Sequence, residues 1–200
     1  DLFEEQIADT WEAGVKGTFW GGRANGSMNV YYTDFENAYF FFFDPGTSTQ
    51  NLGSIPEVEY TGFELEGNAM INDYLTGYFG VGYTDGEIQV AADPADNGNQ
   101  APLVTEWTFN LGGEFRYPVT TDADFVLRAD YSYQGDTYWD PGNISVRSPI
   151  NLLDMRVGVD VADNWSLMLW AKNLTDERYN GEFSPGPAPG ANFLWPAQPR

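Results

Sequence analysis

The side chains of this sequence best suited to binding a small molecule are aromatic, and they gather at residues 138–140 and 183–195. Flat aromatic rings stack on sugars and on planar chelates, and the polar ends of Tyr and Trp can hydrogen-bond to the same ligand. The candidate ligand-binding residues are Tyr138, Trp139, Asp140, Phe183, Phe193 and Trp195. The alternative interpretation is that these rings pack loops against one another or lie at a membrane interface.

A second set of polar side chains alternates with apolar residues along the later part of the chain. Charges of both signs recur at every second position, as in Glu114 and Arg116 or in Arg128 and Asp130. This arrangement suits a wet surface on which neighbouring carboxylates and guanidinium groups pair. The candidate members of this polar lining are Glu114, Arg116, Arg128, Asp130, Arg156, Asp160 and Lys172. They would either contact another part of the same protein or only solvate the surface.

The acidic residues do not point to an enzyme. Glycoside hydrolysis needs two carboxylates at a suitable separation, but among thirty Asp and Glu residues some pair always qualifies. The chain has no His and no Cys, which removes the usual general base, the usual zinc ligands and thiolate chemistry. Residues 93–99 look like a calcium-binding loop, but Ala95 and Val104 stand where such a loop places ligands. We expect no enzyme activity, no cofactor and no resident metal, with loose divalent binding to this acidic loop left open.

Composition excludes further classes of protein. The formal charge is −21, and the nine Lys and Arg residues are scattered, whereas a nucleic-acid binder needs a clustered basic face. Aromatic residues make up 16% of the chain, which excludes a disordered acidic tail. The length of 200 residues suits one domain or a piece of a larger one.

The elements that carry these residues follow a period of two. In residues 75–83, Leu75, Phe79 and Val81 fall on odd positions, and this alternation is typical of β-strands. The predicted strands are eight in number: 11–19, 28–33, 63–71, 75–84, 107–117, 125–134, 153–161 and 165–172. Most have about ten residues, near the ~9–11 that a tilted strand needs to cross a bilayer.

Short and long connections alternate between these strands. The short ones are residues 21–27, 72–74, 118–124 and 162–164, and the long ones are 44–57, 85–106, 135–149 and 175 onward. An antiparallel up-and-down meander with short turns at one end and long loops at the other is typical of an outer-membrane β-barrel with a polar lumen. The predicted fold class is therefore all-β, about eight long strands of a transmembrane β-barrel. The alternative is a soluble β-sandwich, whose strands also alternate but are shorter.

The ends of the chain predict that this barrel is incomplete. The longest purely apolar run, residues 38–43, is far shorter than a membrane helix, and the first residues do not resemble a signal peptide. Bacterial barrels have an even number of strands with both chain ends on the short-turn side. The order of loops here predicts at least one further strand at each end. Eight strands with two open edges would leave backbone groups unpaired in lipid.

Five short segments follow a recognisable order along the chain. They are residues 11–17 (WEAGVKG), 30–34 (VYYTD), 62–66 (GFELE), 173–179 (NLTDERY) and 199–200 (PR). In order and spacing they resemble the C-terminal part of the β-barrel of TonB-dependent outer-membrane receptors. The segment at 173–179, which is similar to N-L-T/F-D-x-x-Y, is the most specific of them.

The resemblance implies a segment of a 22-stranded barrel in the outer membrane of a Gram-negative bacterium. Such a receptor binds a scarce extracellular ligand and imports it with energy that TonB delivers through an N-terminal plug. The implied partners are an iron chelate, cobalamin or an oligosaccharide, then TonB, and outer-membrane lipid and lipopolysaccharide, with no nucleic acid. The plug, the earlier strands and the final strand are absent, so residues 1–200 are predicted to form a single partial domain that cannot transport alone.

Two other functions stay open on the sequence. Long alternating strands freed from a barrel could stack into a cross-β filament. A secreted carbohydrate-binding sandwich would use the same aromatic residues differently.

Overall fold

The computed structural model describes residues 4–44, 47–162, 164–188 and 191–197, and nearly all of them are in strands or in the turns between strands. Two short 3₁₀ helices, η1 (Trp20–Gly22) and η2 (Pro94–Asp96), interrupt the β-structure. The strands are β1 (Ile7–Phe19), β2 (Ala24–Asp44), β3 (Thr49–Met70), β4 (Leu75–Val90), β5 (Trp107–Thr120), β6 (Ala123–Gln134), β7 (Thr137–Tyr138), β8 (Val146–Arg147), β9 (Ile150–Val161), β10 (Trp165–Ala171), β11 (Asn180–Ala188) and β12 (Ala191–Pro196).

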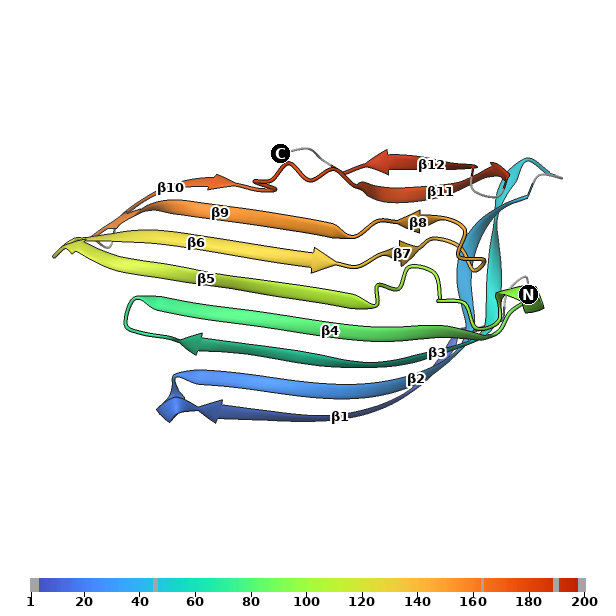
Figure 1. Cartoon of the computed structure of the whole chain (residues 1–200), viewed down its shortest axis with the longest axis horizontal. Coiled ribbons are helices and arrows are strands. Elements are labelled where there is room, and N and C mark those ends of the chain that lie inside the picture. The colour runs from blue at the N-terminus through green and yellow to red at the C-terminus, as the bar shows by residue number, and fades with distance from the viewer. Residues whose placement is uncertain (1–3, 45–46, 163, 189–190, 198–200) are drawn as a thin grey trace.

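The predicted eight-stranded antiparallel meander is confirmed. The main sheet has the order β1-β2-β3-β4-β5-β6-β9-β10, so every strand lies beside its neighbour in sequence within this sheet. Figure 1 shows these strands side by side along the long axis, with the short turns at one end. Two small hairpins, β7–β8 and β11–β12, lie at the other end. We call the two ends the turn end and the loop end.

The sheet is a single layer along most of its length. Its apolar side chains are not covered by a second sheet: Trp11 and Trp165 are each 78% exposed, and Leu169 is 71% exposed. A β-sandwich would bury such a face against its partner sheet. The β-sandwich alternative is therefore wrong for the described part of the chain, and the sheet matches an open piece of a barrel wall.

Several strands extend beyond their predicted limits. The segment 44–57, expected to be a long loop, is mostly strand, because β2 runs to Asp44 and β3 begins at Thr49. Likewise β4 continues to Val90, and β2 already begins at Ala24 within the predicted turn 21–27. The Gly, Ser and Asn residues of these segments suggest loops, but antiparallel pairing satisfies their backbone groups whatever the side chain. The predicted loops 135–149 and 175 onward contain the small hairpins.

The main buried core lies at the loop end. Val58 and Ile88 are completely buried, and they pack with Ala38, Ile55 and Ala101. The segment after β4 folds back onto the sheet to cover them. Its backbone continues the hydrogen-bonding pattern, since the Ala101 N–H donates to the Gly86 carbonyl at 2.7 Å and the Ile88 N–H to the Asn99 carbonyl at 2.9 Å. The sheet face that carries polar side chains along most of the sheet thus carries an apolar core at the loop end.

The extended β2–β3 hairpin crosses the loop end of the sheet. Figure 1 shows the end of β2 and the start of β3, in cyan, turning across the ends of the other strands toward β11 and β12. The Gln50 side chain hydrogen-bonds to the Ser184 hydroxyl on β11. Asn37 has a positive φ of 58° where the hairpin leaves the plane of the wall. We call residues 37–44 and 47–55 the arch.

Candidate functional site

Two of the six predicted ligand-binding residues stack directly on each other. The rings of Trp139, in the β7–β8 connection, and Phe183, on β11, have centroids 5.2 Å apart and planes only 12° from parallel. This pair lines a cavity of about 480 Å³ beneath the arch, which we call the aromatic pocket. A volume of that size lies within the ~300–1,000 Å³ typical of small-molecule sites.

The rest of the pocket comes from segments far apart in the sequence. The arch and the adjoining parts of β2 and β3 supply one wall, the segment before β5 supplies a second, and β11 supplies a third. The remaining lining residues are Gln6, Phe35, Ala38, Tyr39, Phe40, Phe41, Ile55, Tyr60, Ala101, Pro102, Leu103, Gly181 and Glu182. Most of this lining is apolar, with hydroxyl, amide and carboxylate groups at a few points, so it can bind a flat, largely apolar ligand and hydrogen-bond to its rim.

Asp140 holds the loop that presents Trp139. One carboxylate oxygen accepts from the Ser145 N–H at 2.7 Å and the other from the Ile144 N–H at 3.1 Å. Asn143 joins the same turn to the neighbouring loop, because its side chain donates to the Gln100 carbonyl at 2.8 Å and accepts from the Gln100 N–H at 2.9 Å. Asp140 therefore lies next to the pocket as a positioning residue, and a direct ligand contact by it stays a prediction.

The other three predicted residues do not line the pocket. Tyr138 is on β7, where its carbonyl accepts from the Leu103 N–H at 2.8 Å. Phe193 and Trp195 are on β12 with exposures of 59% and 49%. Sequence reasoning missed the contribution of Phe35, Tyr39 and Tyr60, and it used the apolar run at 38–43 only to exclude a membrane helix.

The predicted polar lining forms an ion-pair network on the face opposite the apolar one. Arg116 pairs with Asp160 at 2.7 Å, with Asp124 at 3.4 Å and with Glu114 at 3.7 Å, and Glu114 also meets Arg156 at 3.5 Å. These side chains come from β5, β6 and β9, so the network ties three strands together. These groups are partly exposed, and such pairs contribute only about 0–1 kcal/mol each.

Arg128 and Asp130 form a second group on this polar face. The guanidinium donates to both Asp130 oxygens, at 2.8 and 2.9 Å, and to the Tyr78 hydroxyl at 2.6 Å. The Arg128 guanidinium carbon also lies 5.2 Å from the centroid of the Tyr78 ring. Lys172 follows the end of β10, and among the described residues no carboxylate lies within ion-pair distance of it. Of the seven predicted residues, Lys172 is thus the one outside these two groups.

Aromatic residues on the apolar face form two bands. Near the loop end, Phe63, Tyr83, Trp107, Phe109 and Tyr133 are in successive ring contact, with Tyr83 and Trp107 only 4.7 Å apart. Near the turn end, the contacting rings are Tyr74, Tyr117, Phe115 and Phe125. Trp107 and Tyr117 mark the two bands on β5, and at ~3.3 Å per residue they lie about 33 Å apart along the strand.

That spacing fits a membrane. Strands tilted by ~35–45° would place these outermost rings about 25 Å apart along a barrel axis, comparable with the ~25 Å height of the apolar band of outer-membrane barrels. Among the described residues no helix is long and apolar enough to span a membrane.

Comparison with known proteins decides the family. The family model described as the β-barrel of TonB-dependent receptor-like proteins matches residues 2–174. The chain belongs to the TonB-dependent receptor family. This match confirms the family resemblance and includes the segments at residues 11–17, 30–34 and 62–66. It contains only the first two residues of the segment at 173–179, and residues 199–200 lie outside the described part of the structure.

Solved TonB-dependent receptors share this fold. The ferric yersiniabactin uptake receptor FyuA from Yersinia pestis aligns with a TM-score of 0.80 and 16% identity over 98% of this chain and 29% of that one. The siderophore receptor PiuA from Acinetobacter baumannii gives 0.75 and 25% identity over 96% and 27%. The ferripyoverdine receptor of the outer membrane of Pseudomonas aeruginosa gives 0.69 and 15% over 100% and 26%. The chain therefore spans less than a third of the length of these receptors.

The TonB-dependent receptor family consists of receptors and transporters, and its solved members are outer-membrane proteins. Its barrel wall accounts for the two faces described above, one apolar with aromatic bands and one polar with ion pairs. The acidic segment 93–99 has an internal role, because the Asp93 carboxylate accepts from the Ala95 N–H at 3.0 Å and caps η2. Among the described residues no three His, Cys, Asp or Glu side chains are placed to hold a metal ion.

Proposed function

We propose that this chain is the C-terminal part of the barrel of an outer-membrane receptor that takes up an iron chelate with energy delivered by TonB. The observation that carries the proposal is the aromatic pocket at the loop end, where Trp139 and Phe183 stack. Two of the structural relatives are described as siderophore receptors or as receptors for a ferric siderophore. A ferric chelate is octahedral, but its individual chelating groups are planar, partly apolar units with polar oxygen atoms, which suits contact with an aromatic lining.

The proposed orientation places the loop end outside the cell and the turn end in the periplasm. In outer-membrane barrels the longer connections are extracellular and the short turns periplasmic. The polar face with Arg116, Arg128 and Arg156 would then line the lumen and face the plug through which TonB acts. The aromatic band near the loop end would meet the lipopolysaccharide leaflet.

We also propose that further strands of the complete receptor pair with β1 and β10. Both are edge strands of the sheet. Each backbone group left unpaired at an edge in lipid costs several kcal/mol. Trp11 and Val15 on β1 are 78% and 72% exposed, in keeping with a lipid-facing wall rather than a free edge in water.

The test uses the complete receptor that contains this chain, purified in detergent, and titrates ferric chelates of several chemical types while tryptophan fluorescence is recorded. The variant Phe183→Ala removes one ring of the stacked pair and should weaken chelate binding about tenfold, equivalent to about 1.4 kcal/mol. Phe193→Ala on β12 is the matched control, because Phe193 is a 59% exposed ring outside the pocket lining.

Equal loss in the two variants, or no loss in either, would refute the aromatic pocket as the binding site. In cells, uptake of radioactive iron from the bound chelate should stop when TonB is deleted. Uptake that continues without TonB would refute the energy source. Extraction of the receptor from membranes without detergent, together with binding of an amyloid dye, would instead support the filament alternative.

A further inference from the structure

Building on the proposed uptake function, we infer that the aromatic pocket selects an uncharged or positively charged chelate and rejects polyanionic ones. The inference rests on how charge is distributed between the two ends of the sheet. It concerns the ligand's charge, which the stacking geometry alone does not decide.

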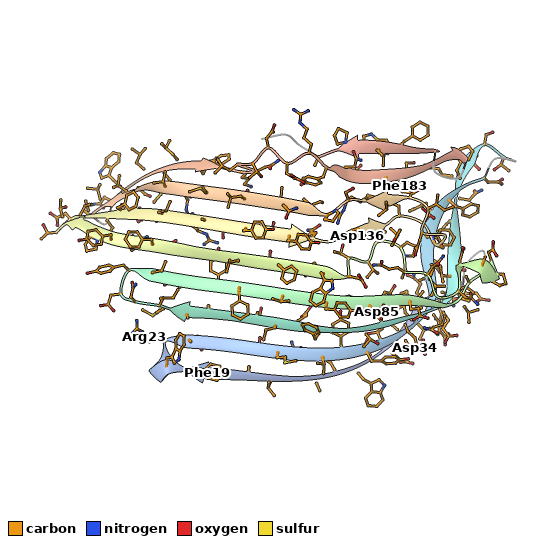
Figure 2. The ribbon with its side chains drawn as sticks, viewed as in Figure 1. Phe19, Arg23, Asp34, Asp85, Asp136 and Phe183 are labelled. Carbon is orange, nitrogen blue, oxygen red and sulfur yellow. The ribbon has the colours of Figure 1, made fainter. Side chains whose placement is uncertain are left out.

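The chain has no Lys or Arg from residue 24 to residue 115, a stretch that includes β2, β3, β4 and the segment that covers the core. The acidic residues of the same stretch are Asp34, Glu36, Asp44, Glu57, Glu59, Glu64, Glu66, Asp73, Asp85, Glu87, Asp93, Asp96, Glu106 and Glu114. Figure 2 shows the contrast along the long axis: Arg23 lies at the turn end, whereas Asp34, Asp85 and Asp136 lie toward the loop end with Phe183.

Carboxylates stand directly opposite one another near the loop end. The sheet register pairs Asp9 with Asp34, Asp34 with Glu59, and Glu59 with Glu87, so four acids cross β1 to β4 in one row. Like charges opposite each other on a sheet repel and are destabilising. This row lies on the sheet face that carries Tyr32 and Phe63, opposite the face that carries the pocket, and it adds to the negative charge of the loop end as a whole.

The pocket itself has no compensating cation. Among its lining residues Glu182 is charged and none is basic. At the loop end Arg178 lies 3.8 Å from Asp176. Arg147 lies outside the pocket lining and keeps its positive charge, because it donates to two neutral groups, the Thr137 hydroxyl at 2.9 Å and the Gly135 carbonyl at 3.3 Å. The remaining described arginines of the network, Arg116, Arg128 and Arg156, lie on the wall and are already paired with carboxylates.

The loop that carries η2 holds further carboxylates close to one another. Burial, followed by the charges of Asp93 and Asp140, raises the pKa of Asp96 above its ordinary value. Asp140 lies on the loop that presents Trp139, so the negative field reaches the stacked pair from two loops. A cleft lined by charges of one sign raises the association rate of oppositely charged ligands by about 10- to 1,000-fold and lowers that of like-charged ones.

The experiment measures binding to the complete receptor for three ferric chelates of different net charge: the monocationic ferrioxamine B complex, a neutral ferrichrome-type trihydroxamate and a trianionic tris-catecholate. The cationic or neutral chelate should bind at least tenfold more tightly than the trianion. The preference should shrink when salt rises from about 50 to about 500 mM, because salt screens charges over a Debye length.

A variant that removes one charge tests whether the carboxylate of the pocket causes the preference for the cationic chelate. Glu182→Gln removes the carboxylate of the pocket and should reduce the preference for the cation over the trianion several-fold. Asp122→Asn is the control, since Asp122 lies in the exposed β5–β6 turn at the opposite end. Removal of charge at the turn end should leave the preference unchanged.

The outcomes separate this inference from the proposed function. If Phe183→Ala weakens binding but the trianion binds as tightly as the cation at both salt concentrations, the charge inference is overturned and the pocket stands. If Asp122→Asn changes the preference as much as Glu182→Gln, the charge inference is also overturned. If Phe183→Ala changes the binding of no chelate, the proposed site itself fails.

Discussion

The wall and the loop end of this sheet share the same strands but are stabilised in different ways. In the wall, apolar side chains such as Leu169 are exposed on one face and ion pairs lie on the other, so backbone pairing between neighbouring strands is the main contact that holds the wall together. At the loop end the strands bend over their neighbours and bury Val58 and Ile88 completely. The same strands thus continue from the single-layer wall into a buried core, where the β3–β4 register shifts at Glu57–Val58 and β4 exchanges β5 for the segment at 99–101.

The two regions should respond very differently to truncation of an apolar side chain. Ile88→Ala leaves a cavity in a closed core and should cost about 2–5 kcal/mol. Leu169→Ala, at a side chain 71% exposed on the wall, leaves no cavity and should cost far less. Hydrogen exchange at residues 86–101 in the detergent-solubilised receptor measures the difference. Comparable protection losses in both variants would mean that the loop end has no separate core.

Within the wall, close packing should matter most where a ring crosses a glycine. On the polar face Tyr78 lies over Gly112 of the next strand, and a methyl group there would overlap the Tyr78 ring. Gly112→Ala should therefore cost about 1–3 kcal/mol, as overpacking usually does. Gly80→Ala is the matched control, because its new methyl group would meet only Asn110 at 3.9 Å.

A thermal-denaturation series of the four combinations of Tyr78→Ala and Gly112→Ala would test the mechanism. Removal of the ring should relieve most of the cost of the added methyl group. If Gly112→Ala lowers the stability no more than Gly80→Ala does, the Tyr78 ring can move away from the added methyl group, and close packing of this ring does not stabilise the wall.

The smallest expected effect is the pH response of the loop end. The pKa of Asp96 is raised mainly by burial, so the folded state holds its proton more tightly than the unfolded chain does. Ionised Asp96 thus disfavours the folded loop at neutral pH, and this penalty disappears as the pH falls through the raised pKa. Asp96→Asn should remove that part of the pH dependence of hydrogen exchange at residues 91–101. Asp73→Asn, in the exposed turn between β3 and β4, should not.

Much of the wall follows from the alternation of residue types. Leu75, Phe79 and Val81 predict both the strand and the apolar face, because side chains of a strand alternate between its faces. The loop end could not be predicted in this way. Beyond Asn37 the alternation changes phase, and Asn51 and Gly53 are typical of loops although they pair with Phe42 and Phe40. Tertiary pairing overrides local preference there.

The site was only partly predictable for the same reason. Trp139 and Phe183 were identifiable as aromatic residues in segments of loop-like composition, but Tyr39 and Tyr60 join them only because the arch brings β2 and β3 across the sheet. The segment at 173–179 also has a local role that composition could not show. The Asn173 side chain accepts from the Glu177 N–H at 2.8 Å and donates to the Glu177 carbonyl at 2.9 Å, which closes the bend after β10.

The bond between Gln50 and Ser184 joins positions 134 residues apart, one on β3 of the main sheet and the other on the separate β11–β12 hairpin. It attaches the arch to β11, so the arch is held both by the sheet from which it extends and by a second contact on the β11–β12 hairpin. A ligand bound beneath the arch would therefore contact both the β2–β3 hairpin and β11. If a bound ligand displaced the arch, the β11–β12 hairpin would move with it, and the strands of the wall would be affected less.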